Sequence, residues 1–138
     1  MKKNINKLVI FGSGTHAKIC LNEFLKNFII KKIYFFNDTN DQNEVKILKK
    51  KFQIIKKYKI LKKKINKNIF FFLGIGNNLK RKKILAQTEN KLGKLNWLKL
   101  VSKYSIIDKS VKIGNGTAVL PGVVINFLSK IGDHCILN

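Results

Sequence analysis

Aliphatic residues recur at every sixth position near the C-terminal end of the chain. The six positions are Ile107, Ile113, Val119, Ile125, Ile131 and Leu137. An α-helix repeats about every 3.6 residues and a strand alternates with a period of two, so neither keeps one residue type in phase at intervals of six. A three-sided parallel β-helix does, because each side takes about six residues and turns one aliphatic side chain inward. The spacing therefore predicts the start of a β-helix; the alternative is a pair of unrelated short strands joined by turns.

Strands and helices alternate in the residues before this repeat. Apolar runs predict strands over 7–11, 33–36, 69–73 and 97–101, and helical spacing predicts helices over 17–28 and 79–92, the second ending at Gly93. Residues 46–67 suit one short strand and one amphipathic helix whose lysine stems cover apolar surface. Strands that alternate with helices form a parallel sheet with helices packed on its faces, so the expected fold class is α/β.

The chain is strongly basic. Its 138 residues include 29 Lys and Arg against 7 Asp and Glu, a formal charge of +22, and such an excess commonly indicates a nucleic-acid or anionic-membrane partner. Arg81 is the only arginine, however, and arginine is the residue whose planar guanidinium makes bidentate hydrogen bonds to phosphates and bases. The aromatic residues lie inside apolar runs and do not form a separate stacking platform. We interpret the lysines as a solvated surface and rank nucleic-acid binding last of three hypotheses.

Cysteine content and hydrophobic runs limit the cellular location. Cys20 and Cys135 provide no disulfide framework and no spacing suited to a metal site. The apolar stretch 8–11 is too short for the core of a signal peptide, and 69–73 is too short to span a bilayer. We expect a cytoplasmic protein without a transmembrane segment or a metal centre.

A glycine-rich turn carries the clearest chemical signal. Gly12, Gly14 and Ala17 match the phosphate-binding fingerprint GxGxxG/A between a predicted strand and a predicted helix. Glycines let the backbone approach a pyrophosphate, and the free N–H groups of the helix start favour its negative charge. Asp38 follows the second strand at about the distance where an acid holds a ribose hydroxyl. The alternative is a tight turn that binds nothing.

Two sets of motifs occur in a fixed order along nearly the whole chain. KLVIFGSGTHAK, FFND and FFFLGIGNNLKRKK are followed by YSIIDKSVKIGNGTAVLPGVVIN and GDHCILN. Together they resemble the bacterial sugar acetyltransferases of the sialic-acid O-acetyltransferase and UDP-4-amino-sugar N-acetyltransferase type. The resemblance implies a Rossmann-like domain over 1–101 that binds a UDP-sugar, and a left-handed β-helix of hexapeptide repeats that begins at 102. It also implies acetyl-CoA as co-substrate and a homotrimer that holds it between subunits.

The resemblance also implies a set of nucleotide-sugar-binding residues. They lie in two glycine loops and one strand end: Gly12, Ser13, Gly14, His16, Asn37, Asp38, Gly74, Gly76, Asn77 and Asn78. His16 could donate a hydrogen bond to a phosphate oxygen or cap its turn. Asn77 and Asn78 could bind the ligand or cap the following helix.

Three positions depart from the pattern of the family. Thr15 stands where relatives usually have a glycine, so a positive φ there would be strained. Asn37 replaces a common aspartate and leaves Asp38 as the sole acid of that loop. Ser102 replaces a histidine that often opens the β-helix, which leads us to expect a looser domain junction.

No residue is assigned as catalytic. The resemblance implies a histidine, backed by an acid, as general base for the acceptor, in the coil just after the segment matching 136–138. His134 lies in the GDH turn before that segment, where we expect a surface turn residue. Residues 102–138 make under two coils, whereas a solenoid needs about three repeating units. We therefore expect a truncated acetyltransferase that is inactive as this chain; the alternative is a stand-alone nucleotide-sugar or dinucleotide-binding domain without catalysis.

Overall fold

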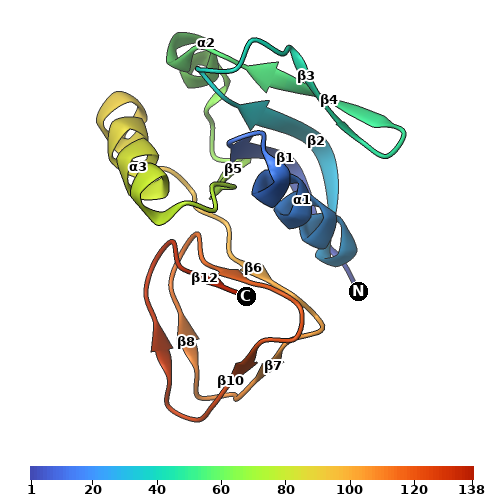
Figure 1. The fold of residues 1–138 in the computed structure, drawn as a ribbon, viewed down its shortest axis with the longest axis vertical. Coiled ribbons are helices and arrows are strands. Elements are labelled where there is room, and N and C mark those ends of the chain that lie inside the picture. Colours follow the sequence, from blue (N-terminus) through green and yellow to red (C-terminus); the bar gives the residue numbers. More distant parts are fainter.

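The chain forms a helix-covered sheet followed by a triangular coil (Figure 1). The computed structural model describes residues 1–138. The first part contains β1 (Lys3–Phe11), α1 (Thr15–Asn27), β2 (Phe28–Phe36), β3 (Glu44–Ile47), β4 (Lys50–Ile55), α2 (Tyr58–Lys64), β5 (Ile69–Leu73) and α3 (Asn78–Leu92). The second contains the short strands β6 (Leu100–Val101), β7 (Ile106–Ile107), β8 (Lys112–Ile113), β9 (Ala118–Val119), β10 (Val124–Ile125), β11 (Lys130–Ile131) and β12 (Ile136–Leu137).

The five-stranded sheet has the order β3-β4-β2-β1-β5. Strands β4, β2, β1 and β5 are parallel, as predicted, whereas β3 runs antiparallel to β4 at the edge. The prediction of a single strand in this region is wrong because β3 and β4 form a hairpin. Only Leu48 and Lys49 connect them, and Leu48 has a φ of +53°. A connection this short can only reverse the chain direction.

The two faces of β1 belong to different hydrophobic clusters, since successive side chains of a strand point to opposite faces. Leu8 and Ile10 pack with Phe24 of α1 on one face. Val9 and Phe11 pack on the other face, where the cluster includes residues of α2 and α3. The first part of the chain is thus a three-layer arrangement with the sheet in the middle, which confirms the α/β prediction.

The sixth-position aliphatic residues stack on one another in the triangular part. Ile107 pairs with Ile125, Ile113 with Ile131, and Val119 with both Val101 and Leu137. The sheets β12-β9-β6, β10-β7 and β11-β8 form its three sides. Val119 is 0% and Ile125 6% exposed, and the other four repeat residues are at least half-buried. The parallel β-helix is therefore confirmed, and the alternative of two unrelated strands is wrong.

The segment that joins the two parts is divided between them. A single strand was predicted over 97–101, but Trp97 forms a bridge with Phe71 of the large sheet, whereas Leu100 and Val101 pair with β9. Residues 98 and 99 pass from one part to the other. The large sheet and the β-helix are consequently connected by a very short stretch of chain.

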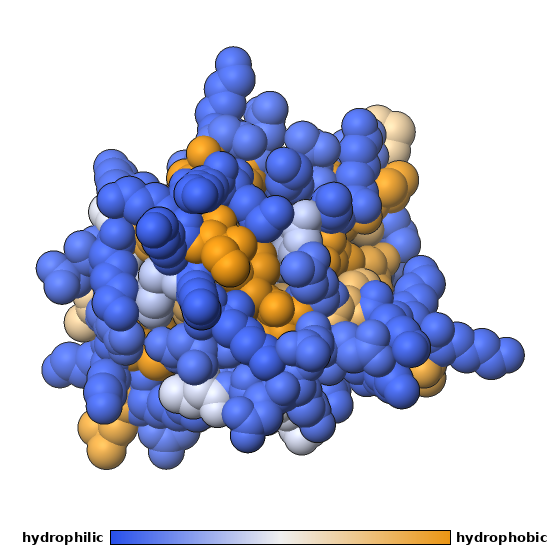
Figure 2. Space-filling view, turned by 90° about the horizontal axis from the view of Figure 1, so that it is seen from above, coloured by the Kyte–Doolittle hydropathy of each residue, from blue (hydrophilic) through white to orange (hydrophobic).

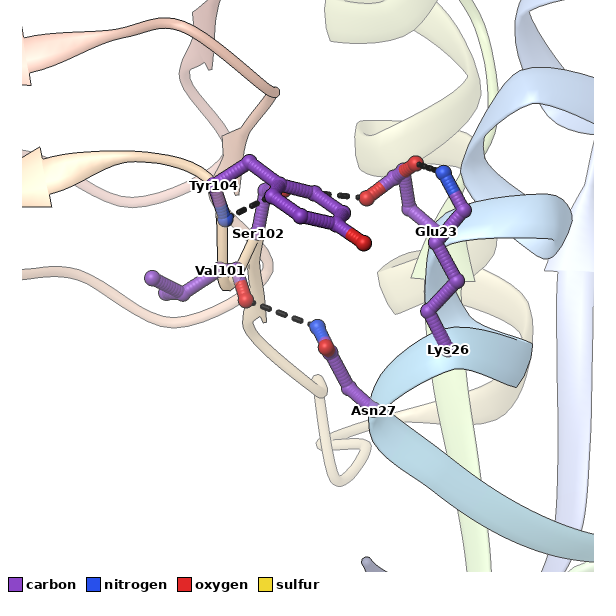
Figure 3. A network of polar contacts seen from close by, with 6 residues as sticks. All are labelled: Glu23, Lys26, Asn27, Val101, Ser102 and Tyr104. Atoms are coloured by element: carbon purple, nitrogen blue, oxygen red, sulfur yellow. Dashed lines mark hydrogen bonds and ion pairs between the residues drawn. The ribbon is translucent and has the colours of Figure 1, made fainter.

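Polar contacts from α1 hold the β-helix against the sheet (Figure 3). Asn27 Nδ2 donates to the Val101 carbonyl at 2.7 Å, and Ser102 Oγ donates to Glu23 Oε2 at 3.0 Å. Glu23 also forms an ion pair with Lys26. Ser102 is only 2% exposed and Glu23 only 3%. The expectation that Ser102 loosens the junction is wrong, because its hydroxyl satisfies a buried carboxylate.

Lysines cover the outer surface and leave the apolar sides of the helices facing the core. In α2, Lys62 and Lys63 are exposed while Tyr58 and Leu61 are buried, as the amphipathic pattern predicted. Lys91 Nζ lies 4.5 Å from the centre of the Tyr58 ring. Seen from the α2 side, the molecule is mostly hydrophilic with a band of hydrophobic residues between (Figure 2). None of the helices combines the length and hydrophobicity that crossing a bilayer requires.

Candidate functional site

The two glycine loops meet at the carboxyl ends of β1 and β5, which are neighbours in the sheet. From β1 the chain continues to β2 on one side, whereas β5 lies on the other, so the strand order reverses here. In open α/β sheets, ligands bind at such a point. Gly12 N donates to the Phe36 carbonyl and Gly74 N to the Phe11 carbonyl, each at 2.8 Å. A cavity of about 430 Å³ opens between the loops.

Most of the predicted binding residues line this loop cavity. Eight of the ten border it: Gly12, Ser13, Gly14, His16, Asn37, Gly74, Gly76 and Asn77. Asp38 lies on an adjoining cavity of about 50 Å³ that shares Gly12, Asn37, Ile75 and Lys80 with the first. Asn78 faces elsewhere, because its Oδ1 accepts a hydrogen bond from Arg81 Nη2 at 2.9 Å. The role of these residues toward a ligand stays a prediction.

Two glycines allow the loops to approach each other and α1. Gly12 has a φ of +91°, and a Cβ there would lie 3.0 Å from the Gly74 carbonyl oxygen. A Cβ on Gly74 would lie 2.6 Å from Ile10 Cγ2 and 2.8 Å from Ala17 Cβ, so α1 packs directly on this loop. Thr15, in contrast, is the first residue of α1 and has no positive φ. The strain expected at Thr15 is therefore absent.

The start of α1 faces the loop cavity without a side-chain cap. Gly14 is the N-cap residue, no side chain accepts from the first turn, and no acidic residue lies in that turn. The first backbone N–H groups of a helix have no partner within the helix, and the helix dipole makes this end positive. The helix start therefore offers hydrogen-bond donors and positive potential to an anion in the cavity.

Ser13 is held by two asparagine side chains. Its Oγ accepts hydrogen bonds from Asn37 Nδ2 and from Asn40 Nδ2, each at 2.8 Å. Asn37 Oδ1 in turn accepts from the backbone N–H of Thr39 at 3.1 Å. An aspartate at position 37 could not donate to Ser13, so the departure from the family pattern has a local structural role here.

Four residues that border the loop cavity were not among the predicted binding residues: Thr15, Ile75, Asn40 and Lys80. Asn40 reaches it from the loop after β2, and Lys80 reaches it from the first turn of α3. Lys80 also borders the small cavity beside Asp38. The position of Lys80, directly after the second glycine loop, is the signal that could have identified it.

Asn77 caps α3. Its Oδ1 accepts from the backbone N–H of Lys80 at 2.9 Å, which is the usual contact of an N-cap asparagine. Of the two alternatives considered for Asn77, capping is confirmed. Its Nδ2 group remains free to contact a ligand, since Asn77 also borders the loop cavity.

His16 lies in the first turn of α1 and borders the loop cavity. Its Nε2 lies 3.4 Å from the Sγ of Cys20, one helical turn further on. Burial, with a smaller contribution from Arg81, lowers the pKa of His16 below its usual 6.5. Burial also raises the pKa of Cys20 to about 12. Both side chains are therefore uncharged at neutral pH.

Arg81 holds the second glycine loop and does not enter the loop cavity. Its Nη1 donates to the Ile75 carbonyl at 3.1 Å and its Nε donates to the His134 carbonyl at 3.1 Å. The only arginine of the chain thus fastens the loop to the β-helix. This role depends on the tertiary structure and has no local signal in the sequence.

His134 is packed against the junction. Its ring meets Trp97 edge-on, with ring centres 4.8 Å apart, and its Nδ1 is buried without a hydrogen-bond partner. Gly116 leaves room for the ring, since a Cβ there would overlap it. Burial is the main reason that the pKa of His134 is lowered. His134 does lie in a turn, as expected, but its ring is half-buried against Trp97 and does not lie on the open surface.

A larger hollow of about 850 Å³ lies beside the site and is bordered by α1 and the β3-β4 hairpin. Its walls carry Lys18, Lys46 and Lys51, and the last two form ion pairs with Glu44. Only Ser13 is shared with the loop cavity. We place the candidate site in the loop cavity, because that cavity contains the glycine loops and the open start of α1.

Known proteins share this sequence pattern and fold. The family model described as PglD N-terminal domain matches residues 7–88, more than half of the chain. A mutant of perosamine N-acetyltransferase from Caulobacter crescentus, solved with CoA and GDP-perosamine, has a TM-score of 0.74 and 25% identity over 97% of this chain and 60% of that chain. The acetyltransferase domain of PglB from Neisseria gonorrhoeae FA1090, in complex with acetyl coenzyme A, has a TM-score of 0.62 and 20% identity, over 96% of this chain and 67% of that chain. The chain thus spans 60% of the length of the first protein, and its likeness to the second concerns the fold alone.

Proposed function

Since the chain belongs to the PglD N-terminal domain family, we propose that its loop cavity binds a nucleotide sugar, the acceptor substrate of an acetyl transfer. The observation that carries this proposal is the meeting of two glycine loops and an uncapped helix start at the point where the strand order reverses. The eight predicted residues that border the loop cavity, together with Asp38 beside it, are proposed as ligand-binding residues, with Lys80 and Asn40 added.

The diphosphate is proposed to lie against the start of α1. Gly14 and His16 border the cavity there, and Lys80 supplies a positive charge from α3. An anion at a helix N-terminus gains about 0.3–1 kcal/mol from the dipole, and up to about 2 kcal/mol where the site is partly buried. Gly14 and Thr15 are exposed at the helix start, which favours the lower part of that range.

The nucleoside is proposed to extend toward Asp38. The small cavity beside this residue has the apolar side chains of Phe36 and Ile84 on its walls, which suit the faces of a base. The Asp38 carboxylate can accept hydrogen bonds from a ribose hydroxyl or from an N–H of the base. These contacts fit any nucleoside, and we propose a UDP-sugar because the family resemblance implies it.

The two parts of the chain are proposed to serve the two substrates. Residues 1–99 are proposed to form the nucleotide-sugar unit, and the β-helix that begins with β6 (Leu100–Val101) is proposed to contribute to acetyl-CoA binding. Acetyl-CoA supplies the activated acetyl group. The β7-β10 side borders a cavity of about 610 Å³ that includes Lys109, which is proposed to contact the CoA phosphates.

The same side of the β-helix is the proposed contact between subunits. Ile106, Val124 and Phe127 are large hydrophobic residues that are mostly exposed there. Apolar patches of this kind mark contact surfaces. They support the homotrimer expected from the family, and light scattering on the purified protein would measure its mass directly.

His134 does not suit the role of general base. Its ring is held by Trp97, its Nδ1 is buried, and its backbone carbonyl is held by Arg81. A base must reach the acceptor with a free ring nitrogen. We therefore expect these 138 residues to bind the acceptor and to show no acetyl transfer of their own.

Calorimetric titration of the full chain with UDP, a UDP-linked amino sugar, GDP and NAD tests the proposal. We expect saturable binding of UDP and of the UDP-sugar. Binding of NAD alone would favour the alternative of a dinucleotide-binding domain. If none of the four ligands bound, the proposed function would be refuted.

A further inference from the structure

We propose that Cys20 is a positioning residue: its thiol donates a hydrogen bond to Nε2 of His16 and so holds the imidazole in the tautomer that presents Nδ1–H to the loop cavity. The Nδ1–H group would then donate to a phosphate oxygen of the bound nucleotide. The second half of this inference rests on the proposed function. The first half concerns the ligand-free protein and can be tested without any nucleotide.

The helix geometry brings the two side chains together. His16 and Cys20 are four residues apart on α1, and residues at this spacing lie one above the other on the same face. The distance from Sγ to Nε2 is 3.4 Å. Cys20 is fully buried, so water does not compete for this contact.

The second ring nitrogen of His16 remains available to a ligand. Nδ1 of His134 is the only buried side-chain nitrogen or oxygen without a hydrogen-bond partner. His16 Nδ1 has no partner within the protein, so it must be open to solvent. The ring borders the loop cavity, beside Gly76, and the cavity is therefore the space that Nδ1 can reach.

The direction of the hydrogen bond follows from the protonation states. A neutral imidazole carries one N–H group and one bare nitrogen, which is a good acceptor, whereas a thiol sulfur is a weak acceptor. The buried thiol of Cys20 keeps its proton because its pKa is about 12, and His16 is neutral because its pKa is lowered. S–H to bare Nε2 is therefore the better pairing, and it leaves the imidazole proton on Nδ1.

This tautomer matters because phosphate oxygens only accept hydrogen bonds. A bare nitrogen facing the diphosphate would repel it, while an N–H group attracts it. The two roles considered for His16 were phosphate donor and turn cap. No side chain caps α1, which leaves the donor role as the one that the geometry supports.

Nitrogen NMR of the full chain labelled with ¹⁵N-histidine tests the tautomer without ligand. There are only two histidines, and a His134→Asn variant assigns their signals. We expect His16 to show a protonated Nδ1 and a bare Nε2. Cys20→Ala should shift the population toward the Nε2–H form, and Cys20→Ser should restore the Nδ1–H form through its hydroxyl. A wild-type Nε2–H tautomer, or a tautomer that Cys20→Ala leaves unchanged, would overturn the assignment of Cys20.

Binding of UDP tests the ligand half. The amide nitrogen of an asparagine side chain lies near the place of Nδ1, and that of a glutamine near the place of Nε2. We expect His16→Gln to weaken UDP binding about tenfold, equal to about 1.4 kcal/mol, His16→Asn to stay closer to the wild type, and Cys20→Ser to bind better than Cys20→Ala. Stronger binding by His16→Gln than by His16→Asn would overturn the donor role. A wild-type chain that binds no nucleotide would overturn the proposed function and the role of His16 as a phosphate donor. The assignment of the His16 tautomer to Cys20 would still be decided by the NMR result.

Discussion

Replacing Ser102 by alanine removes the hydroxyl that satisfies a buried carboxylate at the domain junction. In the wild type, Ser102 Oγ donates to Glu23 Oε2 at 3.0 Å and accepts from the backbone N–H of Tyr104 at 3.2 Å. Glu23 is 3% exposed and keeps only its ion pair with Lys26 after the change. One carboxylate oxygen is then left buried without a donor.

The magnitude follows from the value of a buried hydrogen bond to a charged group, about 1.5–3 kcal/mol. We expect Ser102→Ala to lower the free energy of unfolding of the full chain by about that amount. Urea denaturation followed by circular dichroism measures it, provided that the slope with urea stays unchanged. Ser129→Ala is a matched control, because Ser129 is half-buried and its side chain makes no hydrogen bond; it should change stability by less than about 0.5 kcal/mol.

A double-mutant cycle separates the pair from its surroundings. Combining Ser102→Ala with Glu23→Leu removes both partners, and such a change is much less harmful than leaving one partner unpaired. We expect a coupling energy of about 1–2 kcal/mol between the two positions. Strictly additive effects, or a Ser102→Ala variant as stable as Ser129→Ala, would refute the account of the junction.

Further predictions concern the site and its helices. Lys80→Ala should weaken UDP binding several-fold in calorimetry, while Lys82→Ala, an exposed α3 lysine outside the loop cavity, should not; equal losses would indicate general charge attraction only. Gly74→Ala should destabilise the chain by about 1–3 kcal/mol through overpacking. A Cβ at Gly14 meets no atom within 4 Å, so Gly14→Ala should have a clearly higher melting temperature than Gly74→Ala. The pKa of His16 is lowered from 6.5 in the folded chain, so the unfolded chain binds the proton more readily. The contribution of neutral His16 to the free energy of unfolding is therefore complete above pH 6.5 and is lost as the pH falls below that value. His16→Asn should reduce this fall in urea titrations at successive pH values, and an unchanged pH dependence would contradict the burial of the ring.

Periodic and local features of the sequence predicted most of the fold. The six-residue spacing identified the β-helix because each side has a fixed length, and Val119 and Ile125 point inward as that geometry requires. The family resemblance is confirmed by the match over residues 7–88, and the solved relatives are complexes with CoA or acetyl-CoA, the co-substrate expected of the family. The β3-β4 hairpin was missed because Leu48 adopts a positive φ without the glycine or asparagine that usually signals such a turn.

The site was predictable where it depends on backbone shape and not where it depends on long-range contacts. Gly12 and Gly74 could be identified from the sequence because a backbone with positive φ and a close approach of two loops each require glycine. The contacts of Arg81 with the β-helix, and the packing of His134 on Trp97, join residues far apart in the chain. Nothing local at those positions specifies them, so only the structure could assign their roles.

Amide chemical-shift mapping of the ¹⁵N-labelled chain with UDP tests the central claim most directly, because it reports both whether the nucleotide binds and where. We predict that the largest shifts fall on the backbone amides of Gly12, Gly14, Gly74 and Gly76, with smaller ones at Asp38. The β-helix amides should remain in place. Shifts confined to the β-helix or to the lysine-covered surface, or no shifts at all at saturating UDP, would contradict the account.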